Sequence, residues 1–157
     1  MLDFTKDKLK ISTVLQKLPV FVGLTSDEIE HIQKICTPIT VTEGQTVFRE
    51  GDASTCMYVL MFGEVQLHTR KKGIIHTVEP GEVFGEIGFI NQQKRTATAI
   101  ANGTSILLQL DSNAFQRLVK KHPVTSFTIM RNITMSLADH ITRMNKSGTL
   151  DYLPSRR

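Results

Sequence analysis

The spacing of apolar residues divides the chain into a helical start, a strand-rich middle and a helical end. From residue 8 to residue 18 the apolar positions recur at helical intervals, and Pro19 ends this run. A second helix is predicted to open at Thr25, because Thr25 and Glu28 have the spacing of a capping box. Its apolar face is formed by Ile29, Ile32 and Ile35.

From Pro38 onward the helical spacing gives way to short runs rich in β-branched and aromatic residues. Glycines separate these runs at intervals that are typical of turns. Many short strands with regularly placed turn glycines predict an antiparallel sandwich or barrel. The predicted strands cover residues 39–42, 46–50, 56–62, 64–69, 73–80, 95–101 and 105–110.

The last third is predicted to be helical again. Asp111 or Ser112 can cap a helix that ends near His122–Pro123, and a longer helix follows from about residue 124 to residue 145. One row of the longer helix consists of Met130, Thr134, Leu137, Ile141 and Met144. This row suits either packing on the β domain or a dimer seam. The dimer seam is favoured, because Ile129 and Ile133 offer a second apolar row for the domain itself.

Length and composition are those of one globular domain. With 157 residues, 40% apolar and 22% charged, the chain can bury one core and is not wholly disordered. The longest apolar run, residues 57–62, is far shorter than the roughly 20 residues of a membrane helix. The N-terminus lacks the apolar core of a signal peptide, so no export is implied. Cys36 and Cys56 do not have the spacing of metal-binding cysteines. We therefore expect a cytoplasmic protein with free thiols.

The net charge of +4 suits an anionic ligand but is weak evidence for nucleic-acid binding. The densest basic cluster, residues 70–72, lies at a predicted hairpin tip, where solvated charges are common. Neither feature predicts a DNA-binding surface.

Residues 84–98 carry the most specific chemistry. Gly85 is expected to end a strand, and a short helical turn would then present backbone amides near Gly88 to an anion. Arg95 would face these amides from a new strand, where a guanidinium can pair with a phosphate. Glu86 would repel a phosphate, so it is better suited to accept a hydrogen bond from a hydroxyl group such as that of a ribose.

This segment resembles the phosphate-binding cassette of the cyclic nucleotide-binding domain family. The shared pattern is Phe-Gly-Glu, an aliphatic and a small residue, a short helix, then Arg, a small or hydroxyl residue and Ala. The resemblance runs from about residue 15 to residue 145 and includes 18–24, 43–45, 50–52, 58–60, 62–65 and 110–123. It implies a sensor domain of the type found in catabolite activator protein and protein kinase regulatory subunits, here standing alone without a DNA-binding domain.

The fold implied by the resemblance is mainly β with flanking helices. It is an antiparallel β-roll, also called a jelly roll or double-stranded β-helix, with N-terminal helices and a C-terminal helix pair. The implied division is an N-terminal helical segment (1–36), the roll (37–111), C-terminal helices that serve as lid or dimer helix (112–146), and a flexible tail (147–157).

The family's roles, carried onto this sequence, assign the cyclic phosphate to Arg95 and the ribose 2′-hydroxyl to Glu86. The other implied ligand-binding positions are Phe84, Gly85, Ile87, Gly88, Thr96 and Ala97. The C-terminal helix would close over the base, with Asp139, His140 and Arg143 as lid candidates. His140 is interpreted as a surface histidine rather than as a base contact.

The resemblance leaves the identity of the nucleotide open between cAMP and cGMP. Thr96 matches the hydroxyl of cGMP-preferring members, but members with threonine there also accept cAMP. We take cAMP as the default ligand and cGMP as the close alternative. One arginine balances the single negative charge of either nucleotide, so no metal is expected.

No residue pattern predicts catalysis. The five histidines (His31, His68, His76, His122 and His140) lack metal-binding spacing. His68 and His76 could meet across a hairpin, but without an evident third ligand they are interpreted as a surface pair.

The predicted function is therefore a non-enzymatic cyclic nucleotide sensor in signal transduction. The alternative is an interaction module that keeps the roll but signals by dimerisation or partner binding. Expected partners are the nucleotide, a second copy through the C-terminal helix and a protein effector, but neither DNA nor a membrane.

Overall fold

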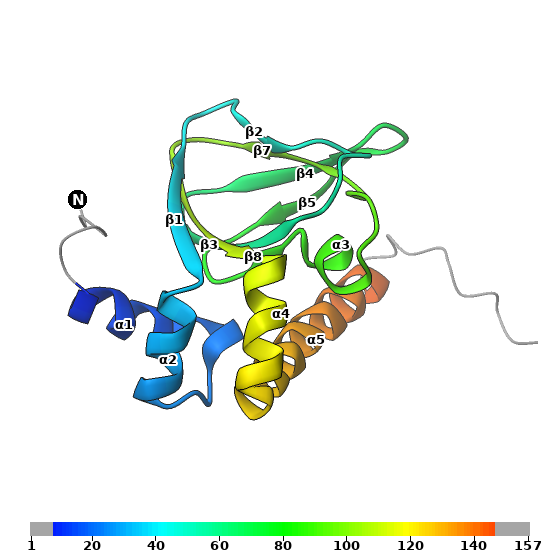
Figure 1. Ribbon diagram of the computed structural model, residues 1–157. Helices are drawn as coiled ribbons and strands as arrows, with labels where there is room; N and C mark the ends of the chain where they lie inside the picture. The colour runs from blue at the N-terminus through cyan, green and yellow to red at the C-terminus, as the bar shows by residue number, and fades with distance from the viewer. Residues whose placement is uncertain (1–7, 147–157) are drawn as a thin grey trace, which may run out of the picture.

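The computed structural model describes residues 8–146, in which helices flank two β-sheets (Figure 1). The predicted flexible tail at 147–157 lies outside these residues. The N-terminal helices are α1 (Lys8–Lys17), η1 (Pro19–Phe21) and α2 (Ser26–Gln33). The later helices are α3 (Glu86–Asn91), α4 (Ser112–Lys121) and α5 (Pro123–Lys146).

Eight strands form two antiparallel four-stranded sheets. The first has the order β1-β8-β3-β6 and contains β1 (Cys36–Val41), β3 (Cys56–Phe62), β6 (Val83–Phe84) and β8 (Ser105–Asp111). The second has the order β2-β7-β4-β5 and contains β2 (Thr46–Phe48), β4 (Val65–Thr69), β5 (Gly73–Val78) and β7 (Thr98–Ala101). Apart from the β4–β5 hairpin, each strand is followed along the chain by a strand of the other sheet, which confirms the predicted β-roll, with helices before and after it in the sequence.

Two predicted strands are shorter than expected because turns interrupt them. The strand predicted over 95–101 begins only at Thr98. The backbone of Arg95 is instead bonded to a turn, because its N–H donates to the Asp52 carbonyl at 2.8 Å and its carbonyl accepts from Gly51 N at 2.9 Å. Asp52 also ends β2 early, since its carboxylate accepts from Arg49 N at 2.9 Å. Arg95 therefore precedes the strand rather than lying on it, contrary to the sequence prediction.

The main hydrophobic core lies between the first sheet and the helices. Its fully buried members include Leu15, Ile29, Ile32, Met57, Ile129 and Ile133. The burial of Ile129 and Ile133 agrees with the row that the sequence assigned to the domain itself. The row predicted as a dimer seam is divided, because Met130 and Leu137 partly pack on this core whereas Thr134 and Ile141 are exposed. A straight helix has 3.6 residues per turn, so positions that recur every 3.5 residues gradually move around its surface and do not all stay on the buried face.

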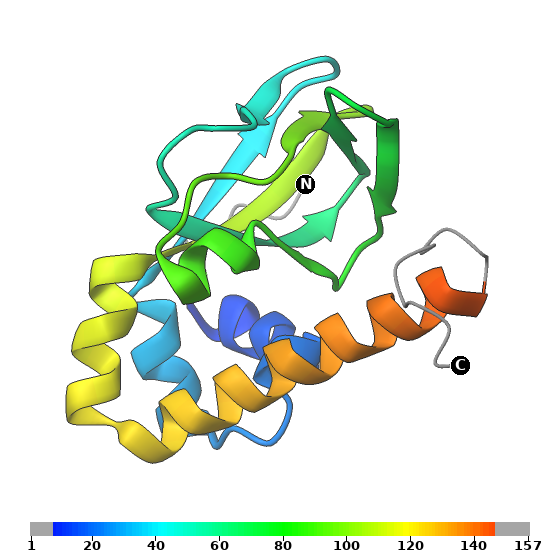
Figure 2. The ribbon, with the colours of Figure 1, turned by 90° about the vertical axis from the view of Figure 1, so that its right-hand side faces the viewer.

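Helix α5 is fixed at its start by polar contacts with the N-terminal helices. The predicted capping box is present, with Thr25 capping α2 and Glu28 bonding back to it. The second oxygen of Glu28 accepts from the Thr125 hydroxyl at 2.6 Å. Further along, the Asn132 amide donates to the carbonyls of Val20 and Val22 at 3.0 and 2.8 Å. From there α5 runs beneath α3 and the roll (Figure 2).

Three smaller expectations can be compared directly with the structure. Cys36 and Cys56 are free thiols. Residues 70–72 form the tip of the β4–β5 hairpin, as their charge and the following glycine predicted. Within residues 8–146, no helix combines the length and apolar character needed to cross a membrane.

Candidate functional site

The cassette is built around two glycines that bring α3 close to neighbouring elements. Gly85 precedes α3 in the left-handed conformation (φ +73°), and a Cβ there would lie 2.6 Å from an Arg95 guanidinium nitrogen. Gly88 is buried, and a Cβ there would lie 2.5 Å from the Ser54 Cβ and 2.7 Å from the Gln93 carbonyl oxygen. Both positions therefore require glycine for steric reasons.

The guanidinium of Arg95 is buried and held from three sides. One terminal nitrogen donates to the Gly85 carbonyl at 2.8 Å, and the other donates to the Cys56 carbonyl at 2.6 Å. The guanidinium carbon lies 4.1 Å from the centroid of the Phe48 ring, in cation–π contact. Only 5% of Arg95 is exposed. These contacts fix the orientation of the guanidinium plane.

Arg95 nevertheless lacks a counterion among the described residues. None of the ion pairs between described side chains includes it. Its Nε atom is also buried without a hydrogen-bond partner within residues 11–146, as is the hydroxyl of Ser54 next to Gly88. A buried unpaired charge is unfavourable unless something neutralises it. Arg95 is therefore a buried cation that forms no ion pair with a described side chain.

Glu86 begins α3 and is also buried, with 8% of the residue exposed. Burial raises the pKa of its carboxyl above the usual value, although its own backbone amide and the positive charge of Arg95 act in the opposite direction. A carboxyl group in this position gains from a hydrogen-bond donor that arrives with a ligand. Glu86 and Arg95 thus offer complementary groups within one cassette.

The remaining predicted cassette residues differ in exposure. Phe84 and Ala97 are buried, and Phe84 stacks on Tyr58 with ring centroids 5.3 Å apart. Thr96 and Ile87 are exposed. Phe84 and Ala97 thus support the walls of the roll, whereas the side chains of Ile87 and Thr96 are accessible from solvent.

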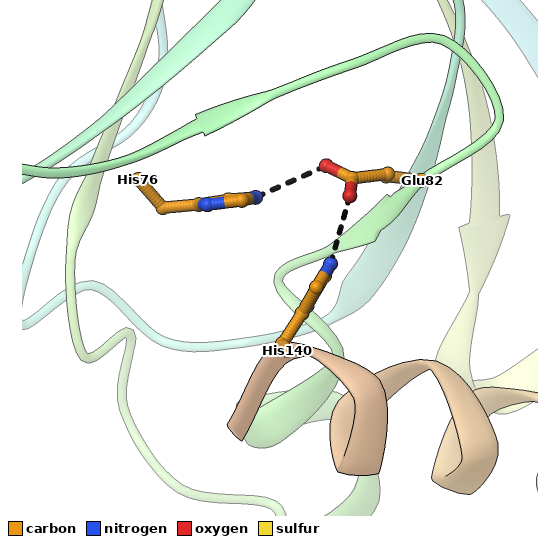
Figure 3. A group of neighbouring side chains, drawn as sticks. All are labelled: His76, Glu82 and His140. Atoms are coloured by element: carbon orange, nitrogen blue, oxygen red, sulfur yellow. Dashed lines mark hydrogen bonds and ion pairs between the residues drawn. The ribbon is translucent and has the colours of Figure 1, made fainter. Parts of the chain in front are cut away.

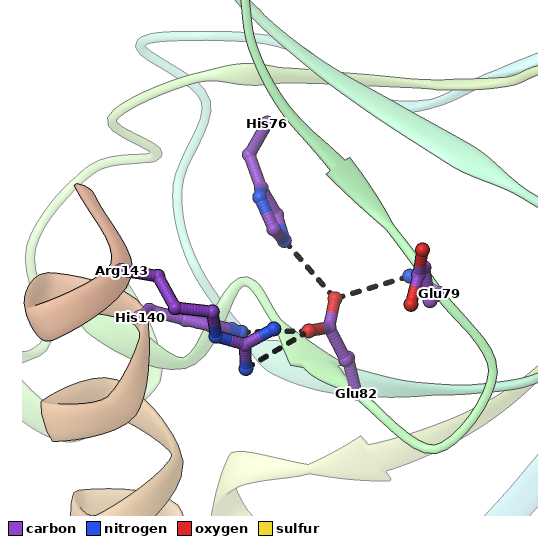
Figure 4. Close-up of polar contacts among 5 residues, drawn as sticks. All are labelled: His76, Glu79, Glu82, His140 and Arg143. Atoms are coloured by element: carbon purple, nitrogen blue, oxygen red, sulfur yellow. Dashed lines mark hydrogen bonds and ion pairs between the residues drawn. The ribbon is translucent and has the colours of Figure 1, made fainter. Parts of the chain in front are cut away.

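Of the three lid candidates on α5, two contact the segment that leads into the cassette. His140 Nε2 lies 2.9 Å from Oε1 of Glu82, and the Arg143 guanidinium lies 3.6 Å from the same oxygen (Figure 4). Asp139 is exposed. The sequence interpretation placed His140 on the surface; its side chain is in fact 17% exposed and contacts Glu82, because α5 turns this position toward the β5–β6 loop.

Glu82 is the centre of these contacts. Its Oε2 atom accepts from the backbone amide of Glu79 at 3.0 Å and lies 3.0 Å from His76 Nε2. Burial tends to raise the pKa of Glu82, but the hydrogen bonds from Glu79, His140 and His76 outweigh it and hold this pKa below the usual value. Glu82 is therefore a carboxylate at neutral pH.

The sequence interpretation assigned no role to Glu82 and missed three of the residues around Arg95. Phe48, Cys56 and Tyr58 contact or face the guanidinium from β2 and β3, and no local motif marks them. The expected pairing of His68 with His76 is wrong, because the register places His76 opposite Leu67 and His68 opposite Ile74. Their sequence separation across the hairpin could not reveal the bulge between Leu67 and His68 that sets this register.

Comparisons of sequence and of structure both find known proteins that are similar to this chain. The chain is 30% identical to glutaminase 1 of Bradyrhizobium diazoefficiens over 145 residues, which are 92% of this chain and 23% of that protein. A cyclic nucleotide-binding domain from Methylobacillus flagellatus superposes with a TM-score of 0.82 at 17% identity, covering 94% of this chain and 88% of that one. The regulatory domain of Toxoplasma gondii PKA, crystallised with cAMP, gives a TM-score of 0.64 at 21% identity, covering 77% and 47%.

The first curated relatives are longer proteins, of which this chain spans between 22% and 33%. The match to the glutaminase is thus confined to a minor part of that protein. The model of the cyclic nucleotide-binding domain matches residues 38–122, more than half of the chain and the whole of the cassette. With the β-roll and the cassette in place, this match shows that the chain belongs to the cyclic nucleotide-binding domain family.

Proposed function

We propose that this domain binds a cyclic nucleoside monophosphate, with the phosphate at Arg95, and acts as a non-enzymatic sensor. The observation that carries the proposal is the buried guanidinium of Arg95, which has no counterion among the described residues and an unpartnered Nε. A cyclic phosphate carries one negative charge, so it would balance this one cation. Arginine also suits phosphate because its planar donors can form paired hydrogen bonds.

Glu86 supplies the second recognition group in this proposal. Its carboxylate would accept a hydrogen bond from the ribose 2′-hydroxyl, while the missing Cβ of Gly85 leaves room for the Arg95 guanidinium beside it. The amides of Ile87 and Gly88 and the hydroxyl of Thr96 would complete the phosphate site. The solvent-accessible side chain of Thr96 supports this role, since a ligand could reach it without displacing the core.

Helix α5 is the proposed lid. It already approaches the cassette, because His140 and Arg143 contact Glu82, which lies three residues before Gly85. A nucleotide would favour the closed position only as far as it contacts α5 better in that position than in an open one. The movement of α5 would then carry the signal to a protein effector or to a second copy of the chain.

Isothermal titration calorimetry with cAMP and cGMP tests the proposal directly. We expect one site per chain, with cAMP as the default ligand and cGMP as the close competitor. Linear 5′-AMP is the matched control, because it keeps the base and ribose but lacks the cyclic phosphate. The absence of heat with both cyclic nucleotides at high micromolar concentration would refute the sensor function. The same fold would then be an interaction module, which no feature of the site favours.

A further inference from the structure

Three metal-ligating side chains converge outside the nucleotide cassette. His76 comes from β5, Glu82 from the loop before β6, and His140 from α5 (Figure 3). The two imidazole Nε2 atoms lie 3.0 and 2.9 Å from different oxygens of the same carboxylate. One ligand atom from each of the three residues lies within 4.8 Å of the other two. Elements far apart in the sequence thus present three donors to one point.

The donor set and its dimensions suit a small transition-metal ion. Zinc binds histidine nitrogen and carboxylate oxygen at about 2.0–2.2 Å, which places neighbouring tetrahedral ligands about 3.3–3.6 Å apart. The nitrogen–oxygen separations of 3.0 and 2.9 Å run to different oxygens of Glu82, are hydrogen-bond lengths, and are shorter than this spacing. To bind an ion, each imidazole would carry its proton on Nδ1, and the ligand atoms, which already lie within 4.8 Å of one another, would adjust to this spacing.

The surroundings hold the carboxylate in place but leave the cluster accessible. The Glu79 amide donates to Oε2 of Glu82, a second contact of the kind that orients metal ligands. The side chains of Glu82 and His140 are 15% and 17% exposed, and that of His76 is 34% exposed. An ion could thus enter from solvent and still lose much of its hydration.

We propose that His76, Glu82 and His140 form a binding site for a divalent transition-metal ion of the zinc class, which ties α5 to the β-roll. Three protein ligands leave a fourth position for water. Because one ligand lies on α5 and two lie on the roll, a bound ion holds this helix next to the segment that leads into the cassette. The metal site stands on this cluster alone and does not require nucleotide binding.

Titration of tag-free, chelator-treated protein with Zn²⁺ and Co²⁺ tests this site. We expect one Zn²⁺ per chain by calorimetry, a raised melting temperature, and the visible absorption of four-coordinate Co²⁺. His76→Asn and His140→Asn should each weaken binding about tenfold or more, since each removes a ligand. His122→Asn is the control, because His122 belongs to a histidine pair elsewhere, in which its ring lies 4.1 Å from that of His31 and is tilted by 45°. Circular dichroism establishes that each variant is folded.

Arg143 provides a further test that adventitious histidine binding would not pass. Its guanidinium competes for Oε1 of Glu82 and is 64% exposed, so Arg143→Gln should tighten Zn²⁺ binding by about 1.5- to 5-fold. An affinity that does not increase contradicts an ion at this oxygen. Absence of four-coordinate Co²⁺ absorption, or wild-type affinity for Zn²⁺ in the His76 and His140 variants, would overturn the proposal. Cyclic nucleotide titration of metal-free protein reports the proposed function separately.

Discussion

Removing the guanidinium of Arg95 is the sharpest perturbation of the proposed nucleotide site. Arg95→Ala deletes a buried cation that has two fixed donors and an unpartnered Nε. Deleting one partner of a buried charged pair costs about 2–5 kcal/mol of binding free energy. At about 1.4 kcal/mol per tenfold change, this corresponds to a loss of affinity of about 30- to 4000-fold for a cyclic nucleotide.

A second substitution separates charge from geometry at the same position. Arg95→Lys keeps the positive charge but loses the planar group that lies 4.1 Å over the Phe48 ring. We expect its affinity for the nucleotide to lie between those of the wild type and Arg95→Ala. Lys94→Ala is the matched control, because it removes an exposed neighbouring charge and should leave the affinity unchanged.

Calorimetric titration with cAMP measures all three variants, and circular dichroism checks that each is folded. Wild-type affinity in folded Arg95→Ala would show that the nucleotide does not bind at this cassette. An equal loss in Lys94→Ala and Arg95→Ala would show that general surface charge, rather than the buried guanidinium, attracts the ligand.

Further substitutions test Glu86, the glycines and the helical core. Glu86→Gln should weaken nucleotide binding but stabilise the free domain by about 0.5–2 kcal/mol. Because burial raises the pKa of Glu86 in the folded state, this gain in unfolding free energy should be absent below pH 4.5 and should grow as the pH rises above it. A gain that does not depend on pH would contradict a burial penalty on the Glu86 carboxylate. Gly85→Ala should cost about 1–3 kcal/mol of stability and also weaken nucleotide binding, because its Cβ would meet Arg95. The control Gly44→Ala has a similar φ but open space around it, so it should lower stability without changing nucleotide binding. Equal nucleotide affinity in the two variants would argue against the clash with Arg95. Ile133→Ala should lower the free energy of unfolding in urea by about 2–5 kcal/mol, because Ile133 is fully buried. Substitution of the exposed Ile141 by alanine should lower it by less than about 0.5 kcal/mol. Similar losses for the two variants would mean that α5 is packed differently.

The sequence by itself predicted the features that depend on near neighbours in the chain. The capping box at Thr25 needs only a hydroxyl and a carboxylate three residues apart, and its contacts form within one helical turn. The burial of Ile129 and Ile133 follows from helical spacing in the same way. Glycine turns and short apolar runs predicted an antiparallel sandwich or barrel, and the resemblance to the family implied that it is a β-roll.

Tertiary structure decided the contacts that join distant segments. Arg95 is held by Cys56 and stacks on Phe48, yet its place in the sequence only indicated a new strand. His140 reaches Glu82, 58 positions earlier in the chain, because core packing fixes the rotation of α5. Periodicity indicates which face of a helix is apolar, but not which loop its polar face meets. The convergence of His76, Glu82 and His140 therefore became visible only when sheet register and helix docking were known.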